Sequence, residues 1–172
     1  MFRALVALLL LLIATSHAGA QTLEDIDRRE AAVMEAWEAT PLTIRRAFFV
    51  SEHPQGFGEY IQRANNVFKS DEQLVAYAEP VGFGWKDIGN GEYRFGFKVD
   101  FEVKTAEGKV LGGQENFADL SQRSHTHNRE FMVVLTLKVS DAPPGDYVVE
   151  YKLRDTTGPK TTSFSLPFKI IK

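Results

Sequence analysis

Residues 93–103 alternate strictly between two kinds of side chain. The segment reads YRFGFKVDFEV, so every odd-numbered position is apolar and every even-numbered position is charged or glycine. Because successive side chains on a strand point to opposite faces, this pattern predicts a long strand with one buried face and one solvated face. Such a strand is stable only within a sheet that is covered by a second layer. The segment therefore predicts a layered β architecture, but it does not indicate a function.

The same period of two recurs through the chain beyond residue 41. Turns that contain glycine or proline separate the alternating segments, as in antiparallel sheets. In the first segment we expect Ile44, Phe48 and Val50 to share one side. Seven to eight short strands predict an all-β fold, an antiparallel β-sandwich over residues 41–172. The expected strands cover residues 42–51, 73–81, 93–103, 109–117, 131–139, 147–153 and 164–170.

The turn before Tyr147 gives one more indication of topology. Residues 141–149 read DAPPGDYVV, so a tyrosine begins the penultimate strand directly after a glycine-containing turn. In immunoglobulin-like domains a tyrosine at this corner bonds to the backbone a few residues upstream, and a core residue, here Val149, follows two positions later. The corner resembles that of an immunoglobulin-like sandwich. The alternative is that Tyr147 is an ordinary strand aromatic.

Residues 1–20 are typical of a secretory signal peptide. Arg3 precedes an apolar run, and Ala18 and Ala20 stand in the A-x-A arrangement of a cleavage site. The apolar run is shorter than the roughly 20 residues that a membrane-spanning helix needs. We therefore predict cleavage after Ala20, a periplasmic or secreted mature protein, and no stable membrane insertion after cleavage. A retained membrane anchor is the alternative.

Residues 21–40 predict a single helix ahead of the sandwich, from Leu23 to Ala39. Thr22 is a suitable N-cap, and Pro41 ends the helix. An apolar stripe on this helix either packs on the sandwich or caps an open edge of it, or belongs to a partner-binding or tethering arm, or forms part of a loosely ordered leader. The stripe comprises Leu23, Ile26, Val33, Met34 and Trp37, and the expected i,i+4 ion pairs are Glu24–Arg28 and Asp25–Arg29.

Composition excludes several classes of chemistry. The chain has no cysteine, which excludes thiol catalysis, iron–sulfur clusters, cysteine-ligated zinc and disulfides. The formal net charge of −3 becomes −4 if Arg3 is removed with the leader. This mild acidity argues against nucleic acid or an anionic membrane surface as the main partner. We expect no cofactor, and the sequence does not indicate the oligomeric state.

Two blocks ahead of the central strand carry a resemblance to other proteins. They read GFGEYIQRANNVF at 56–68 and EQLVAYAEPVGF at 72–83. The order G-F-G-x-Y, arginine, N-x-F and Y-x-E-P resembles uncharacterised secreted bacterial proteins with an immunoglobulin-like β-sandwich domain. The resemblance is confined to these two blocks and implies no activity.

The residues of these blocks allow two interpretations. In the first, Arg63 forms a structural pair with Glu79 or Glu72. In the second, Tyr60, Arg63, Glu79 and Trp85 line a groove that contacts a peptide or glycan. We keep these last four as the candidate ligand-binding residues.

The histidines and the search for catalytic motifs give little support for a metal site or an enzyme activity. His125 and His127 alternate in a polar stretch, residues 121–130, that we expect to be a loop; two histidines alone are too few ligands for a metal. The sequence contains no G-x-S-x-G elbow, no H-E-x-x-H and no phosphate-binding glycine loop before a helix. We therefore expect no catalytic residues, no metal site and no enzyme activity.

The sequence favours an exported cell-envelope protein whose β-sandwich binds a protein, peptide or glycan partner. Two alternatives stay open. One is a structural accessory domain that docks through its helix or an edge strand. The other is a metal carrier or an enzyme without a recognisable motif.

Overall fold

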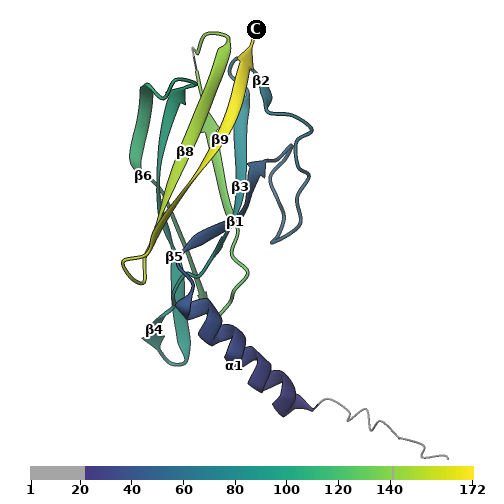
Figure 1. The fold of residues 1–172 in the computed structure, drawn as a ribbon, viewed down its shortest axis with the longest axis vertical. Helices are drawn as coiled ribbons and strands as arrows, with labels where there is room; N and C mark the ends of the chain where they lie inside the picture. Colours follow the sequence, from purple (N-terminus) through teal and green to yellow (C-terminus); the bar gives the residue numbers. More distant parts are fainter. Residues whose placement is uncertain (1–21, 141) are drawn as a thin grey trace, which may run out of the picture.

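The computed structural model describes residues 22–140 and 142–172, so the predicted signal peptide lies outside the described residues. In the described part, one helix precedes nine strands (Figure 1). The helix Leu23–Ala39 has the bounds predicted from the sequence. The elements are α1 (Leu23–Ala39), β1 (Thr43–Phe49), β2 (Val67–Lys69), β3 (Gln73–Val81), β4 (Lys86–Gly89), β5 (Glu92–Thr105), β6 (Val110–Ser124), β7 (Val133–Lys138), β8 (Gly145–Asp155) and β9 (Thr161–Ile171).

The strands form two sheets, as in the predicted all-β sandwich, but the described part has nine strands where seven to eight were expected. One sheet has the order β1-β3-β7, and the other has the order β2-β9-β8-β5-β4 with β6 also paired to β5. The strand pairs are antiparallel except for β2 and β9, which run parallel. The main hydrophobic core draws side chains from both sheets.

Strand β5 lies next to the β6 edge of the larger sheet, between β6 on one side and β8 on the other. Its odd-numbered face is dry as predicted: Phe95, Phe97 and Val99 are fully buried. The opposite face is less uniform than the alternation predicted. Gly96 is buried, and the backbone of β6 approaches it so closely that a Cβ there would lie 1.9 Å from the Leu120 carbonyl oxygen.

The expected strand at 109–117 extends further than the alternation indicated. Strand β6 runs to Ser124, so the first part of the polar stretch 121–130 is a strand and not a loop. The long partner β5 supplies ladder pairing as far as Ser124, opposite Tyr93. The polar side chains of this end of β6 reflect exposure at a sheet edge and not a loop.

A bulge in β1 overturns the prediction that Ile44, Phe48 and Val50 share one side. The register with β3 shifts between Ile44 and Arg46. Ile44 packs against the core between the sheets, whereas Phe48 and Val50 join a second cluster with Val75 and Tyr77. One extra residue in a strand reverses the facing of everything beyond it, which alternation alone does not reveal.

The predicted corner at Tyr147 is present. Its hydroxyl donates a hydrogen bond of 2.6 Å to the Pro143 carbonyl, and Val149 two positions later is fully buried. The turn dipeptide Asn90–Gly91 also behaves as predicted, because both residues have positive φ between β4 and β5.

Helix α1 projects from the end of the sandwich opposite the C-terminus (Figure 1). Thr22 and Asp25 form a reciprocal capping box at its start, and Asp25 pairs with Arg28. Among the described residues neither of the expected i,i+4 pairs, Glu24–Arg28 and Asp25–Arg29, is formed, and the i,i+3 pair takes up both Asp25 and Arg28. Within the described ranges, no helix is long and apolar enough to span a membrane.

Candidate functional site

Trp37, in the last turn of α1, joins the helix to the sandwich. Within α1, all of which the structure describes, it is the only buried residue. Its indole Nε1 donates a hydrogen bond of 2.8 Å to the Phe83 carbonyl. Its ring packs edge-on against Phe83, with centroids 5.1 Å apart, and lies 5.8 Å from Trp85. The helix is therefore attached through one turn, to the segment between β3 and β4.

A lysine from the far end of the chain caps the same turn. The Lys160 ammonium donates hydrogen bonds to the carbonyls of Glu38, Thr40 and Gly82 at 3.1, 3.0 and 2.8 Å. A cation at this position satisfies carbonyls that lack an intrahelical partner and interacts favourably with the helix dipole. Gly82 has a φ of +82°, and a Cβ there would lie 2.7 Å from the Thr40 oxygen. The direction in which α1 leaves the sandwich is thus fixed by packing, charge and backbone shape together.

Beyond this turn, the apolar stripe of α1 is uncovered. Leu23, Ile26 and Val33 are 69%, 50% and 46% exposed. The stripe therefore packs on the sandwich only at its C-terminal end, where Trp37 is buried and Met34 is half-buried. The helix also carries six acidic residues and two basic ones, so an exposed, acidic, amphipathic arm stands off the body.

An open groove of about 870 Å³, here called the root groove, lies where α1 meets the sandwich. Helix α1 forms one side, and the segment 126–130 with parts of β1 and of the loop after it forms the other. The apolar part of its lining includes Val33, Met34, Trp37 and Phe57. Its cationic residues are Arg45 and Arg129.

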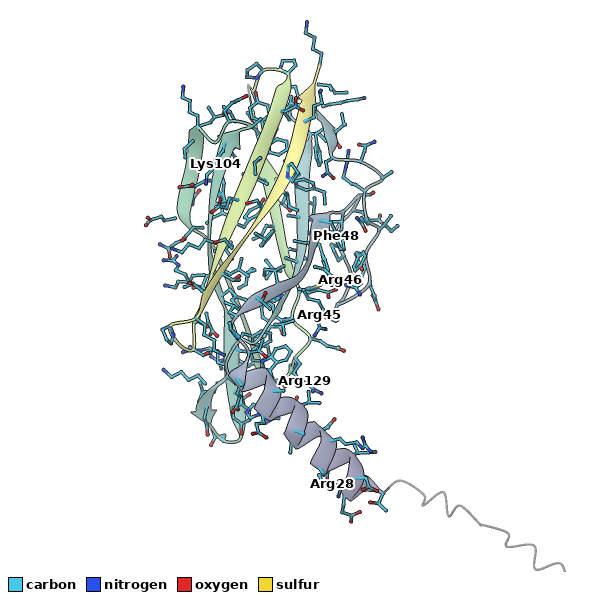
Figure 2. The ribbon with its side chains drawn as sticks, in the orientation of Figure 1. Arg28, Arg45, Arg46, Phe48, Lys104 and Arg129 are labelled. Carbon is cyan, nitrogen blue, oxygen red and sulfur yellow. The ribbon has the colours of Figure 1, made fainter. Side chains whose placement is uncertain are left out.

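The two arginines of the root groove come from different elements. Arg45 sits in the β1 bulge and is exposed, and Arg129 follows β6 and is half-buried. Figure 2 places both near the root of α1 and Arg28 at its distal end. Among the residues that the structure describes, neither has a hydrogen-bond or ion-pair partner for its guanidinium. Glu30 and Glu130 also line the groove, so its charge is mixed.

Trp85, one of the predicted ligand-binding residues, belongs to the aromatic cluster beside the root groove. Its Nε1 donates 3.1 Å to the Asn128 carbonyl, and its ring lies 4.9 Å from that of His127. The His127 ring also contacts Tyr93 at 4.1 Å, whereas His125 bonds the backbone of the β4–β5 turn. The two histidines therefore face different partners. In the described ranges no group of three or more potential ligands could hold a metal ion.

Tyr60 and Glu79, two further predicted site residues, are linked through Arg46 on the outer face of the three-stranded sheet. The buried Glu79 accepts a 3.0 Å hydrogen bond from the Tyr77 hydroxyl, which itself accepts one from the Gly58 N–H. Arg46 donates to the Tyr60 hydroxyl at 3.1 Å and lies 3.9 Å from Glu79. Burial raises the pKa of Tyr77 to about 12, so its hydroxyl remains a donor to the carboxylate. The cluster attaches the loop after β1 to the sheet.

Arg63 lies in a third place, where it braces the crossover into β2. It pairs with Glu72 at 2.8 Å, donates to the Val67 carbonyl at 2.8 Å and stands 4.2 Å above the Phe68 ring. The structural interpretation of Arg63 is confirmed with Glu72 as partner, and not with Glu79. The four predicted ligand-binding residues thus belong to three separate clusters, and they do not assemble into one groove.

Sequence reasoning missed the residues that define the root of α1. The helix has no basic residue in its last turn, which signals that its carbonyls need a cation from elsewhere. That signal does not identify Lys160, which lies 120 residues from Thr40. Likewise, nothing in the pattern distinguishes Arg45 and Arg129 from other surface arginines.

Comparison with protein-family models finds no match for the chain. Comparison with curated proteins finds none either. The functional argument therefore rests on the geometry of the molecule.

Proposed function

We propose that this chain is an exported, non-catalytic protein-interaction domain of the cell envelope, and that it binds through α1 as a rigid arm. The supporting observation is the contrast within α1 itself. Its last turn is held by Trp37 and Lys160, while Leu23, Ile26 and Val33 are exposed on the part that stands clear of the sandwich. A helix is usually stabilised by covering its apolar face, so an uncovered stripe on a firmly held helix favours a partner that covers it.

A protein partner fits this surface better than a membrane does. Interfacial helices that bind anionic lipid carry Lys and Arg on their polar face, whereas six of the eight charged residues of α1 are acidic. The leader at residues 1–20 and the resemblance of residues 56–83 to secreted sandwich proteins support export. The Tyr147 corner supports an immunoglobulin-like topology, in which a stable sandwich displays binding elements at its ends.

Photocrosslinking in the producing cells tests the proposal. A photoreactive residue would replace Ile26 on the stripe in one variant and Glu35 of the same helix in a matched control. We expect a protein adduct at Ile26 and a much weaker one at Glu35. Equal labelling at the two positions, or no protein adduct at Ile26, would contradict the proposal.

The exposed edge of β6 is a second candidate for docking. Among the described strands, β6 pairs with β5 alone, and Val110 and Leu111 at its start are 51% and 52% exposed. An extended segment could add to this edge by main-chain hydrogen bonding. A photoreactive residue at Leu111 tests this surface independently of α1.

A further inference from the structure

We infer that the partner of α1 is a second copy of this chain, bound so that the two arms lie antiparallel and each fills the root groove of the other. This inference rests on the proposed role of α1 as an interaction arm and names its occupant. It follows from three features of the molecule: the continuity of the stripe, the lining of the groove and the order of charges along α1.

The apolar stripe continues from the tip of α1 toward the root groove along one face of the helix, which Glu30 shares. Val33 and Met34 belong to both, while Leu23 and Ile26 continue the same stripe toward the free end. Helix α1 has 17 residues and is therefore about 25 Å long. In an antiparallel pair, the distal half of one helix lies beside the proximal half of the other. Leu23 and Ile26 of one copy then contact the apolar lining of the other copy's groove.

Two arginines of the groove meet acidic residues of the arm in the same arrangement. The first turns of α1 carry Glu24 and Asp27 besides the capping residue Asp25, and an antiparallel partner brings them to the end of α1 where Arg45 and Arg129 have no partner among the described residues, although Glu35 and Glu38 lie at that end as well. Both arginines then gain carboxylates, in contacts that the described residues of one copy do not provide. Arg side chains are well suited to such contacts at interfaces.

The middle of the helix is also self-complementary. Arg29 and Glu30 are adjacent near the midpoint of α1, where a two-fold axis would pass. Across that axis, Arg29 of one copy can face Glu30 of the other, and the contact occurs twice. An isologous pair uses the stripe and the groove of both copies together, so it closes and leaves neither surface open for further growth.

Sedimentation velocity on the purified full chain over a range of micromolar concentrations is the first test. We expect a monomer–dimer equilibrium. Leu23→Ser together with Ile26→Ser is expected to raise the dimer dissociation constant by about 100-fold or more, since two apolar side chains are lost from each half of the interface. Val110→Ser with Leu111→Ser removes a similarly exposed pair from β6 and should leave the constant unchanged. A monomer at every concentration, or a dimer unaffected by the Leu23 and Ile26 changes, would overturn the inference.

A charge-exchange pair gives a sharper test. The first variant carries Arg45→Glu and Arg129→Glu in the groove, and the second carries Glu24→Lys and Asp27→Lys on the arm. Each variant alone opposes like charges in both halves of the interface, so each should dimerise at least about tenfold more weakly. Their mixture restores opposite charges in both halves and should form heterodimers as tightly as the original chain. Failure of the mixture to associate, with helix content unchanged by circular dichroism, would contradict the proposed contacts.

The crosslinking experiment separates this inference from the proposed function. An Ile26 adduct with the mass of two copies supports both. An Ile26 adduct to a different protein, with a monomeric purified chain, overturns the second-copy inference and leaves the interaction arm standing. Absence of any Ile26 adduct overturns the interaction arm itself.

Discussion

At the scale of single residues, the even-numbered face of β5 shows how one alternating pattern contains side chains of different importance. Lys98 is exposed, and none of its described neighbours forms an ion pair with it. Asp100 is 17% exposed at its side chain, accepts a 2.7 Å hydrogen bond from Arg154 and another from the Asn116 N–H. Asn116 has a positive φ, so Asp100 also supports the irregular part of β6.

We therefore expect Asp100→Ala to lower the free energy of unfolding by about 1 to 3 kcal/mol, because Arg154 and the Asn116 N–H both lose their acceptor. Lys98→Ala on the same face should change it by less than about 0.5 kcal/mol. Urea unfolding of the two variants measures the difference. Equal effects would show that the Asp100 contacts do not contribute to stability.

Two buried tyrosines provide a matched comparison of hydroxyl groups. The Tyr77 hydroxyl connects Gly58 to Glu79, whereas the Tyr151 hydroxyl has no hydrogen-bond partner among the described residues. Tyr77→Phe should cost about 1 to 3 kcal/mol, since it leaves the buried Glu79 carboxylate without its donor. Tyr151→Phe should be neutral or stabilising by up to about 1 kcal/mol. Chemical denaturation tests both, and a clear loss at Tyr151 would indicate a buried water that bonds its hydroxyl.

Alkaline pH should destabilise the fold partly through Tyr77. Burial raises its pKa from 10.0 to about 12. Between these values the unfolded chain releases the phenol proton while the folded chain keeps it, so the free energy of unfolding falls as pH rises. Below about pH 10 both states are protonated, and Tyr77 adds no pH dependence. Urea titrations from neutral to alkaline pH should show a shallower decline for Tyr77→Phe than for the original chain, and identical slopes would contradict the assignment.

At the scale of elements, α1 depends on a cap that lies outside its own sequence. Its start is local: Thr22 and Asp25 satisfy each other's backbone groups. Its end relies on Lys160, whose three hydrogen bonds join the last turn to the segment after β3. The end of the helix is therefore held by a residue of the β8–β9 turn, far from it in sequence.

Lys160→Met keeps the length of the side chain and removes the ammonium. We expect a loss of about 1 to 3 kcal/mol in unfolding free energy and faster amide exchange in the last turn of α1. Lys169→Met is the control, because Lys169 is half-exposed at its side chain and 3.6 Å from an exposed Asp146. Hydrogen exchange by mass spectrometry should separate the two, and unchanged exchange at residues 34–40 in Lys160→Met would remove the capping role.

At the scale of the whole molecule, the sandwich could be predicted from the sequence because its determinants are local. The alternation in 93–103, the turn at Asn90–Gly91 and the cap at Thr22 each act within a few residues. The bulge at Arg45 and the extension of β6 could not be predicted, because the register of a neighbouring strand decides them.

The candidate site could be predicted even less well than the fold, because residues far apart in sequence form it. Tyr60, Arg63, Glu79 and Trp85 are near one another in sequence, but the fold distributes them over three clusters. The root groove instead combines Arg45, Arg129 and α1, which are far apart in sequence. Such a site is visible only once the sheets and the helix have been assembled.

The exposure of the distal part of α1 predicts that this part contributes little to the free energy of unfolding of the sandwich. Residues 22–33 lie in the exposed part of α1, while Trp37 packs on Phe83 inside the main core. At concentrations where the chain is monomeric, deleting residues 22–33 should lower the unfolding free energy by less than about 1 kcal/mol, because little buried apolar surface is removed. Trp37→Ala should cost about 3 to 5 kcal/mol, because it leaves a cavity beside Phe83.

Denaturant unfolding compares these two variants, and sedimentation velocity follows their association. The deletion should abolish self-association while the sandwich stays folded, since it removes Leu23 and Ile26 but not the core. Loss of folding on deleting residues 22–33 would mean that the arm stabilises the sandwich directly. Its exposed stripe would then reflect a structural element and not a surface for a second copy.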